Sequence, residues 1–99
     1  MRRLPFRVEQ GAPCLDGHFP GRPVVPGVVL LDAALAALGA TGPLRIEQAK
    51  FLRPCLPGMD LELVLAPRAD GGSDLRVEHG GALMAGARVR PLAMEPGDG

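Results

Sequence analysis

The sequence predicts an α+β fold in which one long helix packs against an antiparallel sheet of about five strands. An apolar run over residues 28–38 has the composition of a helix, and several short segments around it alternate apolar with polar residues. At 99 residues the chain has room for a single hydrophobic core. We therefore expect one domain over residues 1–90, and a disordered tail over residues 91–99, where Pro, Gly and acidic residues gather.

The chain is expected to begin with a strand over residues 4–9, because every second residue there is apolar (Leu4, Phe6 and Val8). The next segment, residues 11–21, is rich in Gly and Pro and predicts a loop.

The helix is expected to begin just after Pro26, since proline suits the first helical turn, and to end at Gly39. Only Asp32 interrupts its apolar circumference. A helix that is apolar all round is buried on nearly every side, and in so small a domain only a sheet wrapped around it supplies that burial.

The rest of the chain predicts strands joined by tight turns. The turn signals are Asp70-Gly71-Gly72 and His79-Gly80-Gly81, which are typical of β-hairpins. The expected strands are residues 44–52, 61–66, 75–78 and 83–89.

Composition excludes several classes of function. The formal charge is zero, from 11 basic and 11 acidic residues, and the chain has no Trp or Tyr. A protein that binds nucleic acid usually carries a net positive charge, so binding to nucleic acid is not expected here. Residues 24–40 form the longest apolar stretch, but they contain Pro26, Gly27 and Asp32 and fall short of the ~20 residues of a membrane span.

The two cysteines, Cys14 and Cys55, stand too far apart for a C-x-x-C pair, and two histidines do not complete a zinc set. The polar N-terminal residues do not fit a signal peptide. A cytoplasmic protein without a metal is therefore expected.

Residues able to do chemistry gather between positions 17 and 32. His18 lies in a Pro- and Gly-bounded loop, which suits a general base near neutral pH. Gly27 falls in the first helical turn, where free N–H groups and the helix dipole favour an oxyanion. Burial is expected to raise the pKa of Asp32, which would make it a neutral acid able to donate a proton. Together these groups suit removal of a proton next to a carbonyl.

The segment His-Phe-Pro-Gly-x-Pro-x-x-Pro-Gly over residues 18–27, with an acid fourteen positions after the His, resembles the hotdog-fold 3-hydroxyacyl-acyl-carrier-protein dehydratases. A second segment, Phe-x-Arg-Pro-x-x-Pro-Gly-x-Asp over residues 51–60, resembles the same family. The family's fold, a central helix wrapped by an antiparallel sheet, agrees with the elements expected above.

The resemblance implies reversible loss of water from a 3-hydroxyacyl thioester to give the trans-2-enoyl thioester, in fatty-acid or polyketide-like synthesis. His18 matches the catalytic base, Gly27 the oxyanion donor and Asp32 the acid. It implies a homodimer, with sites formed across the interface, or a heterodimer. It also implies an acyl carrier protein as partner and no cofactor beyond the carrier's phosphopantetheine.

The resemblance further implies an apolar tunnel for the acyl chain. Its expected lining is Phe19, Pro26, Val28, Leu31 and Phe51. Three cationic side chains, Arg22, Lys50 and Arg53, are expected to contact the acidic carrier protein or its phosphate, although a solvated face explains them equally.

Two features depart from the stand-alone fatty-acid enzymes of the family. Many relatives carry Glu where this chain has Asp32, and the chain is shorter at its N-terminus. It looks closer to the compact dehydratases of aryl-polyene pathways.

Other readings of these residues stay open. A hotdog thioesterase would hydrolyse the same thioester, and a non-catalytic or heterodimeric partner subunit would only bind it. Single residues also have alternative roles. Asp32 could form half of a buried ion pair, and Gly27 could serve only packing. Cys14 could be a nucleophile beside His18.

Overall fold

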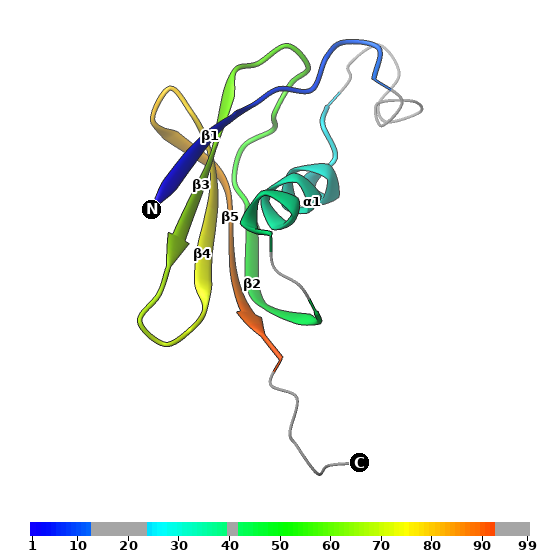
Figure 1. The fold of residues 1–99 in the computed structure, drawn as a ribbon. Coiled ribbons are helices and arrows are strands. Elements are labelled where there is room, and N and C mark those ends of the chain that lie inside the picture. The colour runs from blue at the N-terminus through cyan, green and yellow to red at the C-terminus, as the bar shows by residue number, and fades with distance from the viewer. Residues whose placement is uncertain (13–23, 40–41, 93–99) are drawn as a thin grey trace.

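The computed structural model describes residues 1–12, 24–39 and 42–92. These residues form one antiparallel sheet in the strand order β1-β3-β4-β5-β2, and one helix lies across one face of it (Figure 1). This arrangement confirms the predicted fold class. The elements in chain order are β1 (Arg2–Phe6), α1 (Gly27–Leu38), β2 (Leu44–Phe51), β3 (Leu61–Pro67), β4 (Ser73–His79) and β5 (Ala82–Pro91).

The core lies between the helix and the inner face of the sheet. Leu30 and Ala34 of α1 are buried there, 3% and 2% exposed. The facing side chains come from alternate positions of the central strands, as the period-two pattern predicts. They include Leu61, Leu63 and Leu65 of β3 and Leu75 and Val77 of β4.

Both predicted hairpin turns are confirmed. Between β3 and β4, the Oδ1 of Asp70 accepts a hydrogen bond from the Gly72 N–H at 3.0 Å, and Gly71 has φ 91°. Between β4 and β5, Gly80 and Gly81 both have positive φ, a conformation that glycine adopts without a steric cost.

The first strand lies further toward the N-terminus than expected. β1 is paired from Arg2, opposite Leu65, to Phe6, opposite Leu61. Since β3 begins at Leu61, no partner continues the ladder toward Glu9. Val8 is nevertheless buried, and its carbonyl accepts a hydrogen bond from the Gly58 N–H at 2.8 Å.

The helix begins and ends as predicted, but the expectation that it is buried on nearly every side is wrong for the single chain. Only Leu30 and Ala34 are fully buried. Val28, Asp32 and Ala36 are exposed and follow one another at intervals of four residues. They therefore form one stripe along the helix, which we call the outer stripe. A single five-stranded sheet covers one side of the helix and leaves this stripe uncovered.

The last strand runs further than expected. β5 continues to Pro91, and the Leu92 N–H donates to the Pro43 carbonyl at 3.0 Å. The remainder of the expected tail, residues 93–99, lies outside the described residues. Over the parts of the chain that the structure describes, no helix has the length and hydropathy needed to cross a membrane.

Candidate active site

A groove of about 450 Å³ lies where the start of α1 meets the segment that follows β2. One wall comes from the residues that lead into the helix and from its first turn. The other comes from the end of β2 and the four residues after it. The described residues that line this entrance groove are Val24, Val25, Gly27, Val28, Leu30, Phe51, Leu52, Arg53, Pro54 and Cys55.

Backbone hydrogen bonds hold the two walls together. The Val25 N–H donates to the Cys55 carbonyl at 2.8 Å, which fixes the start of the helix beside the opposite wall. The N–H groups of Leu52 and Arg53 both donate to the Met84 carbonyl, at 2.9 and 3.1 Å. The groove is therefore built by pairing between segments that are distant in sequence.

Gly27 is the first residue of α1 and touches Phe51 of β2. A Cβ atom at position 27 would lie 2.8 Å from both Cδ1 and Cε1 of the Phe51 ring, closer than real Cβ contacts. The φ of Gly27 is not positive, so the backbone does not require glycine here. The close approach of the Phe51 ring is what requires glycine at this position.

The helix N-terminus beside the groove has backbone N–H groups without intrahelical acceptors. Pro26 is the N-cap, and it supplies no side-chain hydrogen bond to the helix. The Val29 N–H bonds to the Pro26 carbonyl at 3.0 Å, whereas helix geometry gives the N–H groups of residues 27 and 28 no intrahelical acceptor. No acidic side chain occupies the first turn, so the positive end of the helix dipole is not neutralised locally. This end of the helix suits a carbonyl oxygen that gains negative charge.

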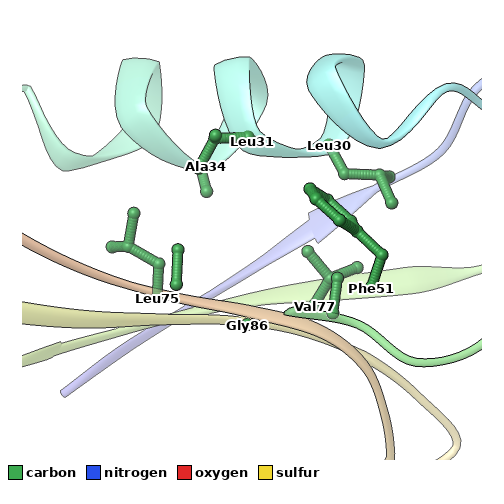
Figure 2. A pocket seen from close by; sticks show the side chains of 9 residues that line it. Leu30, Leu31, Ala34, Phe51, Leu75, Val77 and Gly86 are labelled. Carbon is green, nitrogen blue, oxygen red and sulfur yellow. The ribbon is translucent and has the colours of Figure 1, made fainter. Parts of the chain in front are cut away.

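Behind the groove, between the helix and the sheet, lies a much smaller hollow of about 10 Å³, which we call the inner slot. Figure 2 shows the Phe51 ring in the gap between Leu30 of the helix and Val77 of the sheet. Phe51 lines both the entrance groove and the inner slot. The other slot-lining residues are Leu30, Leu31, Ala34, Leu75, Val77, Ala85, Gly86 and Ala87.

Asp32 does not lie where the sequence predicts. It is exposed on the outer stripe, and it does not line the entrance groove. It lies five positions after Gly27 in the helix, a step of about 7.5 Å along the axis and about 140° around it. The expected burial of Asp32 is wrong for the single chain, because the sheet covers only the opposite side of the helix.

The other predicted site residues divide among three places. Val28 and Arg53 line the entrance groove, Leu31 lines the inner slot, and Phe51 lines both. Pro26 caps the helix beside the groove. Lys50 lies on the outer face of the sheet, in a hollow that it shares with Gln48, Arg76 and Arg88. The structure thus separates Lys50 from Arg53. His18, Phe19 and Arg22, together with Cys14, lie outside the described residues.

Sequence reasoning missed several lining residues. Cys55 is 1% exposed at the base of the groove, and burial raises the pKa of its thiol, which disfavours the reactive thiolate. Ala85 and Ala87 line the inner slot from β5. The alternating pattern of β5 indicates that these alanines face inward, but it does not indicate which helix residues they meet.

The arrangement of helix and sheet is similar to that of solved dehydratases. The chain superposes on a structure titled "The Dehydratase Heterocomplex ApeI:P from Xenorhabdus doucetiae" with a TM-score of 0.76. The match covers 89% of this chain and 83% of that one, at 22% sequence identity. This likeness shows a hotdog fold.

A family model described as "ApeI-like: ApeI dehydratase" matches residues 2–86. The chain belongs to this family of dehydratases, which confirms the resemblance seen in its sequence. Curated relatives are also named as dehydratases. The chain is 42% identical over 69 residues to the 3-hydroxyacyl-[acyl-carrier-protein] dehydratase FabZ of Haemophilus influenzae. It is 36% identical over 69 residues to the protein of that name from a Bradyrhizobium species.

These alignments cover 57% of this chain and 47% of the Haemophilus protein, and 56% and 45% for the Bradyrhizobium pair. The chain thus spans about half the length of the curated relatives that it matches.

Proposed function

We propose that the protein is a dehydratase that removes water reversibly from a 3-hydroxyacyl thioester to give the trans-2-enoyl thioester. The observation that carries this proposal is the family match over residues 2–86, a segment that contains His18, Gly27 and Asp32. Among the described residues, Gly27 lines a groove that is apolar except for Arg53 and that opens at a helix N-terminus whose N-cap, Pro26, makes no side-chain hydrogen bond to the helix. The relatives named as dehydratases of acyl-carrier-protein substrates support the same reaction class.

In the proposed reaction the thioester carbonyl lies at the start of α1. The N–H of Gly27 donates to the carbonyl oxygen and stabilises the negative charge that develops there. His18 removes the proton from C2, and the electron pair of that C–H bond becomes the C2–C3 double bond. The C3–O bond breaks as Asp32 protonates the departing hydroxyl, which leaves as water. No metal or organic cofactor takes part in these steps.

We further propose that the site is completed by a second copy of the chain. Asp32 projects from the outer stripe, whereas Gly27 lines the entrance groove, so one copy does not bring Asp32 to the C3 hydroxyl of a substrate whose carbonyl is bound at Gly27. In a homodimer, Asp32 of one copy would approach the groove of the other. The acyl chain would then lie along the apolar surfaces of Val28 and Phe51, which line the entrance groove. A heterodimer with a second hotdog chain is the alternative assembly, supported by the similar structure, which is a dehydratase heterocomplex.

The substrate is proposed to arrive on an acyl carrier protein in the cytoplasm. Arg53 is the one charged side chain among the described residues of the entrance groove, and it suits the phosphopantetheine phosphate or an acidic residue of the carrier. Arg22 is proposed to act with it. Lys50 lies on the outer face of the sheet, so it would meet only a carrier protein that reaches around the β2 edge.

The proposal is tested by incubating wild type and His18→Ala with a 3-hydroxyacyl thioester on carrier protein. Mass spectrometry follows the acyl group, and the enoyl thioester tests the reverse direction. We expect the loss or gain of one water in wild type, and at least a hundredfold slower change in the variant, as for removal of a general base. Release of free carrier thiol would instead identify a thioesterase. A folded wild type that changes neither substrate would indicate a partner subunit without activity of its own.

A further inference from the structure

Phe51 lies between the entrance groove and the inner slot, and it lines both of them together with Leu30. The entrance groove on one side of it measures about 450 Å³, and the inner slot on the other about 10 Å³. A cavity of the smaller size holds about one water molecule, so the slot is closed to any acyl chain while the ring stays in place.

The walls of the inner slot are suited to an alkyl chain. Every side chain that lines it is apolar, so an inserted methylene chain would leave no polar group without a partner. Ala34, Ala85 and Ala87 contribute only a methyl group each. A slot with such small side chains along it widens once the one large aromatic ring is removed.

The position of Phe51 is not explained by its contribution to the core of the single chain. The side chain is 54% exposed on a strand at the sheet edge, so the burial that it gains is small. Its ring instead contacts Gly27, where the absence of a Cβ lets it approach the helix start. In Figure 2 it stands across the gap between α1 and the sheet.

We propose that Phe51 determines acyl chain length by closing the inner slot, so that the enzyme prefers thioesters whose chains end in the entrance groove. This inference rests on the proposed function and names its substrate class: short-chain 3-hydroxyacyl thioesters. Long chains are excluded because their distal methylenes meet the Phe51 ring.

The experiment compares wild type with Phe51→Ala on 3-hydroxybutyryl, 3-hydroxyoctanoyl and 3-hydroxypalmitoyl thioesters of the same carrier protein. Each additional methylene that becomes buried strengthens binding about fourfold. We therefore expect the kcat/KM ratio of palmitoyl to butyryl substrate to rise about tenfold or more in Phe51→Ala. The matched control is Leu56→Ala, because Leu56 is 45% exposed and lines neither the entrance groove nor the inner slot. In this control the ratio is expected to stay as in wild type.

A wild type that already prefers the palmitoyl substrate, or a ratio that does not change in Phe51→Ala, would overturn the inference. A second measurement separates it from the proposed function. Calorimetry compares the binding of unreactive butyryl and palmitoyl amides of pantetheine to the same three proteins. If wild type dehydrates none of the three thioesters, the proposed function fails. The inference that Phe51 closes the inner slot is then supported if Phe51→Ala alone gains affinity for the palmitoyl amide. It is contradicted if Phe51→Ala gains none.

Discussion

At position 27 the choice of glycine follows from a single contact. The Phe51 ring occupies the space that any Cβ would need, at 2.8 Å from two ring carbons. Nothing in the backbone conformation demands glycine, and in a helix glycine is less favourable than alanine by about 0.8–1.0 kcal/mol. The chain accepts this local cost at the point where the helix start, the groove and the aromatic ring meet.

Gly27→Ala is expected to stabilise the helix but impair the site. The new methyl group displaces the half-exposed Phe51 ring. It also crowds the backbone N–H that is proposed to donate a hydrogen bond to the thioester carbonyl. The free energy of unfolding, measured in urea, should therefore change by no more than about 1 kcal/mol, while kcat/KM falls about tenfold or more. The double variant Gly27→Ala, Phe51→Leu is the control, and it should recover part of the loss. An unchanged kcat/KM in the single variant would contradict the role of the close contact.

Asp70 provides a prediction about acid stability. The Gly72 N–H and then the Arg90 guanidinium, at 2.7 Å, hold the pKa of this carboxyl below its ordinary value of 3.8. A folded-state pKa below the unfolded one stabilises the fold at pH values above the unfolded pKa, and that stability is lost as the pH falls through the folded pKa. We expect Asp70→Asn to be less stable than wild type at neutral pH, with the difference shrinking as the pH falls below about 3.8.

Urea unfolding of both proteins across this pH range measures the effect. Asp74→Asn is a suitable control, because Asp74 also faces an arginine, Arg88, but lies in a strand rather than in the hairpin turn. A difference between wild type and Asp70→Asn that stays constant down to the lowest pH would contradict the assignment.

Among the elements, α1 is stopped by its C-cap. Gly39 has φ 70°, and its N–H bonds to the Ala36 carbonyl at 3.1 Å, so the chain leaves the helix in the left-handed conformation. The sequence could predict this end, because glycine followed by a Gly-Pro pair is a stop signal that depends on neighbours in the chain alone.

Gly39→Ala should lower the free energy of unfolding by about 1 kcal/mol, because a Cβ is unfavourable at positive φ. Space is not the reason, since no atom of the described residues lies within 4 Å of where that Cβ would be. Asn tolerates the left-handed conformation better, so Gly39→Asn should lose less. Equal losses in the two variants, measured by urea unfolding, would show that the cap conformation is not the cause.

The strands show where local pattern suffices and where it does not. Alternation in residues 61–66 and 75–78 identifies β3 and β4 and their inward side chains, because the period of two is a property of each strand. The bounds of β1 depend on where β3 begins, so no pattern within residues 4–9 reveals them. The Gly27–Phe51 contact likewise joins two motifs whose meeting only the fold decides.

At the scale of the whole molecule, the sheet has two unlike edges. β1 has five residues, which include Pro5 and the charged Arg2 and Arg3, features that discourage pairing with another strand. β2 has eight residues without proline, and it leaves Ile46 and Phe51 about half exposed. The outer stripe of α1 is uncovered as well. These uncovered surfaces are what the proposed second copy would bury, and they explain why the sequence predicts a buried Asp32 that the single chain exposes.

A bulky charge on the outer stripe should therefore prevent assembly. Ala36→Arg is expected to leave the chain folded, since Ala36 is exposed, but to shift the mass measured by light scattering from dimer to monomer and to abolish activity. Ala69→Arg, an equal change at an exposed position in the β3–β4 turn, should alter neither. A dimeric and active Ala36→Arg would place the interface elsewhere.

In the proposed dimer, His18 and Gly27 of one copy act with Asp32 of the other. Mixing two inactive variants tests this shared site. His18→Ala and Asp32→Asn should each be nearly inactive as homodimers. After equal mixing and exchange, half of the dimers are mixed and each regains one intact site, so about a quarter of wild-type activity should return. Native mass spectrometry verifies that mixed dimers have formed. Mixed dimers that recover no activity would contradict the shared site.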